Sequence, residues 1–116
     1  MLFICYPKCT TCQKAKNFLD GRNISYELRD IKLQNPTRAE IEKWHKLSGL
    51  PLKKLFNTSG LLYKQMQLSG RLSSMSEQEQ YELLASDGML VKRPILIADG
   101  KGLFGFKQQD WEKIIV

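Results

Sequence analysis

The chain has 116 residues, and 18 Lys and Arg against 12 Asp and Glu give it a formal charge of +6 at pH 7. Apolar residues make up 42% and charged residues 26%, as in ordinary globular proteins, and the length predicts one domain over residues 1–116. No apolar run approaches the roughly 20 residues that span a bilayer, and the N-terminus lacks the charged start of a signal peptide. These features exclude an integral membrane protein and predict a cytoplasmic one with no membrane contact.

The basic residues are scattered, with no run of five like charges. Such a pattern is typical of a solvated surface, and no aromatic residues are interleaved with the bases as in nucleic-acid-binding grooves. We therefore expect no direct contact with nucleic acid, and we take the protein to be a monomer.

Three cysteines, Cys5, Cys9 and Cys12, lie within eight positions. An odd and crowded set cannot connect distant loops, which excludes a disulfide scaffold. A structural zinc site needs about four ligands, but the chain has a single histidine, His45, and no second cysteine pair. We expect no metal and no resident cofactor.

The first thirty residues predict a β-α-β unit. The apolar segment Leu2–Tyr6 is closed by Pro7 and is typical of a buried strand. From Thr10 apolar residues recur at helical spacing, and Gly21 stands where a glycine ends a helix. The alternation over Ile24–Arg29 predicts a half-buried second strand.

The middle of the chain, about residues 33–92, predicts a helical insert. Two capping boxes, Thr37–Glu40 and Ser76–Glu79, begin helices that Gly49 and Asp87-Gly88 end.

The last part returns to strands. Pro94–Ala98 and Leu103–Phe106 flank the turn residues 99–102, which predicts a hairpin, and Trp111 belongs to a short closing helix. The order β-α-β, helical insert, β-β-α predicts an α/β fold with a four-stranded mixed sheet and helices packed on its faces.

The strongest functional motif is the C-x-x-C of Cys9 and Cys12, directly after a strand and at the start of a helix. The unpaired N–H groups and the dipole of the first turn favour a thiolate at Cys9, and Lys8 and Lys14 add positive charge. Cys12, three residues on, can reach back to close a disulfide. We predict that Cys9 attacks and Cys12 resolves; the alternative is that both are small core residues.

Three other residues, Cys5, Pro94 and Arg93, bear on the site. Cys5 lies in the first strand, where alternation predicts a buried and inert thiol. Pro94 opens a strand, which implies an edge, a strand start or a cis bond. A cis bond would expose the backbone of Arg93 to an incoming peptide or thiol compound, whereas the alternative makes Arg93 a solvated charge.

Further motifs stand at Tyr6–Ala15, Ser86–Leu90, Lys92–Ile95 and Gly105–Lys107. Through them the chain resembles the ArsC/Spx/YffB family of small bacterial proteins over its whole length. The resemblance implies a thioredoxin-like fold with a helical insert before the cis-proline strand. It places Cys9 on the reactive cysteine, Pro94 on the cis-proline and Arg93 on an arginine that helps arsenate reductases hold their oxyanion. We assign Thr10, Thr11, Arg93 and Pro94 to substrate binding.

This sequence departs from the glutaredoxin-coupled arsenate reductases of that family. Phe56-Asn57-Thr58 and Gly105-Phe106 stand where their two further arginines would fall, and Cys12 is a second cysteine that they typically lack. The loss of two planar cationic donors predicts weak arsenate reduction.

We therefore predict a thiol-disulfide oxidoreductase whose Cys9/Cys12 pair forms a reversible disulfide, with glutathione, another small thiol or a protein disulfide as partner. The alternative is an Spx-like redox sensor that binds the RNA polymerase alpha subunit, because Spx-like proteins use the same C-x-x-C as a switch. Against it, Spx proteins continue after their last helix whereas this chain ends at Val116, and Asn57-Thr58-Ser59 stands where Spx has an arginine. An arsenate reductase ranks third.

Overall fold

The structure is a computed structural model that describes residues 1–115. Strand β1 (Leu2–Cys5) is followed by helix α1 (Thr10–Gly21) and strand β2 (Glu27–Asp30), and β1 pairs with β2 in parallel. The predicted β-α-β order is confirmed, with two corrections. Gly21 is the last residue of α1 and the left-handed residue comes two positions later, at Asn23. The second strand begins only at Glu27: the Ile24 N–H donates to the Leu19 carbonyl in the turn, and Leu28, which the alternation placed on the buried face, is 53% exposed.

The segment between β2 and the next strand is helical, as predicted. Both capping boxes are present: the Thr37 side chain accepts the N–H of Glu40, and the Ser76 side chain accepts that of Glu79. Gly49 ends its helix in the left-handed region with φ 68°. The elements are α2 (Arg38–Ser48), the 3-10 turn Leu52–Leu55, α3 (Leu61–Gln65), the 3-10 turns Leu68–Gly70 and Leu72–Ser74, α4 (Glu77–Ser86) and the 3-10 turn Gly88–Leu90.

The chain ends with strand β3 (Ile95–Ala98), strand β4 (Lys101–Phe104) and helix α5 (Gln108–Ile115). The hairpin is tighter than expected, because the turn consists of Asp99 and Gly100 alone. Both have positive φ, 51° and 70°, as the commonest two-residue hairpin turn requires.

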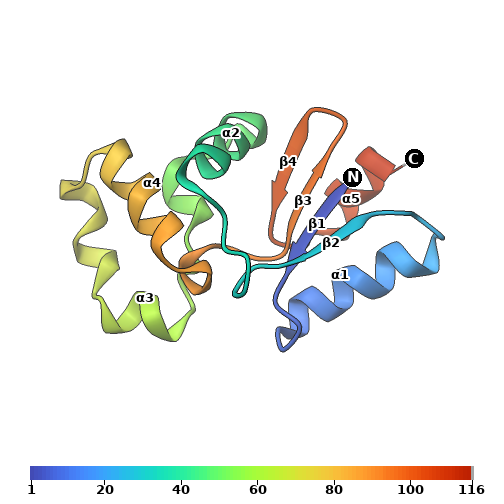
Figure 1. Ribbon diagram of the computed structural model, residues 1–116, viewed down its shortest axis with the longest axis horizontal. Coiled ribbons are helices and arrows are strands. Elements are labelled where there is room, and N and C mark those ends of the chain that lie inside the picture. The colour runs from blue at the N-terminus through green and yellow to red at the C-terminus, as the bar shows by residue number, and fades with distance from the viewer. Residues whose placement is uncertain (116) are drawn as a thin grey trace.

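The four strands form one mixed sheet in the order β2-β1-β3-β4, with β1 and β3 at its centre. Figure 1 shows the strands on one side of the molecule and α3 and α4 at the other end of its long axis, which measures 43 Å. Within the described residues no helix is both long and apolar enough to cross a membrane.

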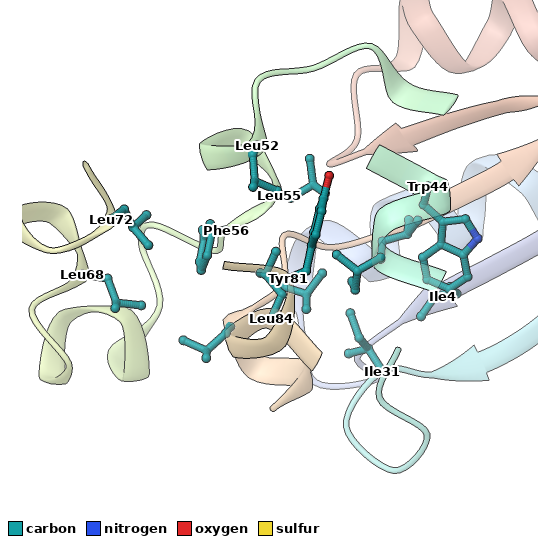
Figure 2. Close-up of a cluster of buried hydrophobic side chains, with 14 residues drawn as sticks. Ile4, Ile31, Trp44, Leu52, Leu55, Phe56, Leu68, Leu72, Tyr81 and Leu84 are labelled. Carbon is teal, nitrogen blue, oxygen red and sulfur yellow. The ribbon is translucent and has the colours of Figure 1, made fainter. Parts of the chain in front are cut away.

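Each face of the sheet carries its own buried cluster. Ile4 and Ile95 pack against Trp44 of α2 and the insert, and Figure 2 shows this cluster continuing through Tyr81 and Leu84 of α4. His45 ties α2 to the same region, with its ring nitrogens 2.7 Å from the Tyr81 hydroxyl and 2.8 Å from the Leu50 carbonyl oxygen. The second cluster joins α1, α5 and the opposite face of β1 and β3: Phe3, Cys5, Cys12, Ala15, Leu19, Leu96 and Trp111.

Candidate active site

The C-x-x-C motif lies where β1 passes into α1. Cys9 is the N-cap of α1, in extended conformation, and its own N–H donates to the Tyr6 carbonyl at 2.9 Å. No side chain caps the helix start, so the Cys9 thiol stands beside the unpaired N–H groups of the first turn. Cys9 is half-buried, whereas Cys12 is only 1% exposed and faces the core with Ala15. The predicted division into an accessible and a buried thiol agrees with this geometry.

The Cys12 sulfur is held from three sides. The backbone N–H of Tyr6 donates to it at 3.3 Å. The side chains of Cys5 and Cys9 are its other two hydrogen-bond partners. The hydrogen bond to Cys5, followed by burial, raises the pKa of the Cys12 thiol far above its ordinary value. Cys12 is therefore a thiol, not a thiolate, at neutral pH.

Arg93 lies two residues before β3 and lines the same cavity as Cys9. The peptide bond between Arg93 and Pro94 is cis, as the resemblance implies. The guanidinium lies over the ring of Tyr6, with its Cζ 5.2 Å from the ring centroid. Its Nε and Nη1 atoms are buried and have no hydrogen-bond partner among the described residues. Two buried cationic donors without an acceptor are costly, and an anion bound beside them would complete their bonds.

A cavity of about 330 Å³ opens in front of these groups. Of the predicted site residues, Cys9, Thr11 and Arg93 line it. Thr10 is exposed and Pro94 is buried, and both lie outside the lining. The other lining residues come from the insert, from the segment before β3, from the last residue of β4 and from the turn after it: Asn57, Ser59, Gly60, Lys92, Phe104, Gly105, Phe106 and Lys107.

Sequence reasoning missed two cations of this cavity, Lys92 and Lys107. In the sequence both stand only at the ends of stretches that carry the family resemblance, and nothing in the local pattern sets either cation apart. No carboxylate is among the lining residues, so the cavity has three cationic side chains with Arg93 and no acidic one. Asn57 and Phe106, which stand where the arsenate reductases would have two further arginines, do line the cavity, but their side chains are neutral.

Gly105 shapes the wall of the cavity. It has φ 82°, and a Cβ built on it would lie 3.1 Å from Cε of Lys92. Its N–H donates to the Pro94 carbonyl at 2.8 Å, and its own carbonyl accepts the indole N–H of Trp111 at 3.1 Å. These bonds fix the turn after β4 against the start of β3, and so hold Lys107 and Arg93 at one site.

Within the described residues no three His, Cys, Asp or Glu side chains group closely enough to hold a metal ion. The chemistry that this arrangement can perform is that of the sulfur atoms and of the cations around them.

Residues 5–114, nearly the whole chain, match the ArsC family. The chain belongs to the ArsC family. It is 45% identical over 113 residues to YusI, an uncharacterized protein of Bacillus subtilis, with 97% of this chain and 96% of YusI covered. It is 28% identical over 114 residues to the regulatory protein MgsR of the same organism, with 98% of this chain and 89% of MgsR covered.

Among solved structures, the crystal structure of an ArsC family related protein from Bacteroides fragilis superimposes with a TM-score of 0.95 and 52% identity. The match covers 97% of this chain and 95% of that protein. This likeness confirms the predicted thioredoxin-like α/β fold with its helical insert. The relatives of this chain thus include a regulatory protein, MgsR, beside the uncharacterized YusI.

Proposed function

We propose that the protein is a thiol-disulfide oxidoreductase in which Cys9 attacks the substrate and Cys12 resolves the mixed disulfide. The observation that carries the proposal is the contrast between the two thiols. Cys9 lies at the helix start and on the cavity, whereas Cys12 is buried directly behind it. We place this activity in a reducing compartment such as the cytoplasm, where a C-x-x-C pair is returned to its dithiol form.

The reaction needs no group beyond the thiols. The Cys9 thiolate attacks one sulfur of a substrate disulfide, which forms a mixed disulfide and releases the other sulfur as a thiolate. Cys12, once deprotonated, attacks the Cys9 sulfur, closes the Cys9–Cys12 disulfide and releases the second substrate thiolate. Two molecules of a reducing thiol, such as glutathione, then restore the dithiol and leave as their own disulfide.

The cavity favours an anionic thiol as the partner. Arg93 has two buried donors that lack an acceptor, and Lys92 and Lys107 add positive charge on the same wall. A carboxylate of glutathione or of an acidic peptide would accept from Arg93 while its sulfur faces Cys9. We assign substrate binding to Thr11, Arg93 and these two lysines; Thr10 and Pro94 contribute through the backbone that positions their neighbours.

Trapping experiments test the proposal. A Cys12→Ser variant mixed with glutathione disulfide is expected to gain the mass of one glutathione at Cys9, and a Cys9→Ser variant to gain none. The wild-type protein is expected to close its own disulfide and to accelerate reduction of hydroxyethyl disulfide when glutathione and glutathione reductase are present. If hydroxyethyl disulfide is reduced no faster with the wild-type protein than with glutathione alone, and no adduct is trapped, the proposed oxidoreductase activity is wrong.

A redox-sensing regulator is the second candidate, because the regulatory protein MgsR is similar to this chain over 98% of its length. In that case the same Cys9–Cys12 disulfide would change the affinity for a partner such as the RNA polymerase alpha subunit. Binding of the purified alpha C-terminal domain, measured by calorimetry with reduced and oxidised protein, tests this role. We expect no binding at micromolar concentration in either form. Binding that depends on the redox state would favour the regulatory function over the oxidoreductase.

A further inference from the structure

Cys5 was expected to be an inert core residue, but it faces the same helix as the redox pair. Along β1 the side chains alternate: Phe3 and Cys5 belong to the cluster that contains Cys12, and Ile4 belongs to the cluster on the opposite face. Cys5 is 5% exposed and is the last residue of β1. Its side chain therefore points toward α1, just behind the C-x-x-C motif.

The Cys12 sulfur lies at the end of the same strand. It accepts the N–H of Tyr6 at 3.3 Å, and only two covalent bonds separate that nitrogen from the Cα of Cys5. Since these bonds are about 1.3 and 1.5 Å long, the Cys12 sulfur is within about 6 Å of the Cys5 Cα. The hydrogen bond between the two thiols agrees with this short separation. The three sulfurs form a series that runs from Cys9 at the cavity, through Cys12, to Cys5 in the core.

We propose that Cys5 is a third redox thiol, which exchanges with the Cys9–Cys12 disulfide to form a buried Cys5–Cys12 disulfide. The inference rests on the proposed function, which supplies the first disulfide. Cys5, having lost its proton to solvent, attacks the sulfur of Cys12. The Cys9–Cys12 bond breaks, the Cys5–Cys12 bond forms and Cys9 leaves as a thiolate, so the number of disulfides is unchanged.

The exchange would change what the protein presents to its surroundings. Cys9 leaves on the cavity side, where solvent reaches it. The oxidised pair would then lie in the core, out of reach of external thiols, while Cys9 stands reduced on the cavity. The protein would keep its oxidising equivalent until the exchange reverses.

Digestion with trypsin distinguishes the Cys9–Cys12 disulfide from the Cys5–Cys12 disulfide. Cleavage after Lys8 and Lys14 places Cys5 in peptide 1–8 and both other cysteines in peptide 9–14. A Cys9–Cys12 disulfide stays within peptide 9–14, whereas a Cys5–Cys12 disulfide joins the two peptides. The reduced wild-type protein is treated with hydroxyethyl disulfide, quenched with iodoacetamide after increasing times, and digested. We expect the closed peptide 9–14 first, and then a joined pair that carries an alkylated Cys9.

A Cys9→Ser variant tests Cys5 without the attacking thiol, and serine is a favoured N-cap residue, so the helix start is kept. Oxidised with diamide, which takes up the two hydrogens, the variant is expected to lose about 2 Da and to give the joined peptides. The matched Cys12→Ser variant is expected to give none, since Cys12 lies between the other two sulfurs. Joined peptides in equal amount from both variants, or none from Cys9→Ser, would overturn the inference. Peptide 9–14 with an internal Cys9–Cys12 disulfide in the wild type would support the proposed function whichever result the variants give.

Discussion

The guanidinium of Arg93 lies over the ring of Tyr6, with its Cζ 5.2 Å from the ring centroid, so that a residue just before β3 is positioned by the residue that follows β1. The pairing holds the cation at the cavity that Cys9 also lines, without neutralising it, because an aromatic face offers no formal negative charge. Arg93 therefore stays free to bind the anionic part of a substrate.

We predict that Arg93→Gln lowers kcat/KM for glutathione disulfide by roughly ten- to hundredfold, since a hydrogen bond to a charged group contributes about 1.5–3 kcal/mol. The rate with hydroxyethyl disulfide, which has no charge, is expected to change little. Lys8→Gln is the matched control, because Lys8 is an exposed cation near Cys9 that does not line the cavity. Equal losses with both substrates would show that Arg93 acts on the thiols and not on the anion.

The second prediction concerns pH. Hydrogen bonding to Cys5 and burial raise the pKa of Cys12, so its reactive thiolate is a small fraction at neutral pH that grows about tenfold per pH unit. Closure of the Cys9–Cys12 disulfide from a glutathione mixed disulfide is therefore expected to accelerate about tenfold per unit between pH 7 and 9. Rapid acid quenching followed by mass measurement gives this rate.

A pair of Cys5 variants separates the two causes of that pKa shift. Cys5→Ala removes the hydrogen-bond acceptor that stabilises the neutral Cys12 thiol, so the rise in closure rate is expected to move to lower pH. Cys5→Ser keeps an acceptor at the same place and is expected to stay close to the wild type. If both variants follow the wild-type profile, burial alone controls Cys12.

The third prediction is that arsenate is reduced slowly at best. Lys92 and Lys107 supply charge, but as point charges, and only Arg93 offers the planar fork that binds an oxyanion through two donors. Replacing a neutral wall residue, Asn57→Arg, is expected to raise glutaredoxin-coupled arsenate turnover. Lys8→Arg leaves the cavity unaltered and serves as control. Efficient turnover of arsenate by the wild-type protein would contradict this prediction and favour an arsenate reductase.

Much of this molecule could be predicted from local pattern. The capping boxes at Thr37 and Ser76 need only residues three positions apart, and the C-x-x-C needs only a strand before it and a helix after it. The cavity could not be predicted in this way, because Asn57, Lys92 and Lys107 come together only when the insert and the turn after β4 pack around the sheet. No spacing in the sequence predicts that these three residues lie close together.

Cys5 is an intermediate case. Alternation along β1 predicted its burial correctly, and the same alternation places it on the α1 face with Phe3. Its contact with Cys12, however, depends on how far α1 lies from the sheet, which the sequence does not reveal. The end of α1 shows a second limit: Gly21 matched the stop pattern, but the chain turns at Asn23, since asparagine also tolerates positive φ.

The fourth prediction concerns Gly88, in the 3-10 turn that follows α4. A Cβ built on this glycine would lie 1.9 Å from the carbonyl oxygen of Ile31, a backbone atom directly after β2. The insert and the sheet therefore meet too closely for any side chain. Gly88→Ala is expected to lower the free energy of unfolding by roughly 1–3 kcal/mol or more, measured by urea denaturation. Gly70→Ala, which has open space around it, is the control and is expected to have a far smaller effect.

The last prediction concerns the joint between β2 and α2. Arg29 binds Glu40 through two hydrogen bonds, Nη1 to Oε2 at 2.7 Å and Nη2 to Oε1 at 2.9 Å. The Arg29 guanidinium, more than any other group, holds the pKa of Glu40 below its ordinary value. The ion pair therefore stabilises the fold fully above the ordinary glutamate pKa of about 4.3, and this contribution is lost as pH falls through the lowered pKa.

Glu40→Gln is accordingly expected to cost about 1 kcal/mol at pH 7, a modest figure because the pair is partly exposed, and progressively less in acid. Urea midpoints at pH 7, 5 and 3 measure the difference. Glu42 is a matched control on the same helix, since its contacts with Arg38 and Lys46 are longer, at 3.8 and 3.6 Å. Glu42→Gln is expected to change stability little at any pH. Protonation of Glu40 in the wild type removes the ion pair with Arg29, so an effect of the charge must shrink in acid. A loss of stability in Glu40→Gln that is the same at pH 3 as at pH 7 would therefore show that the side chain acts by packing.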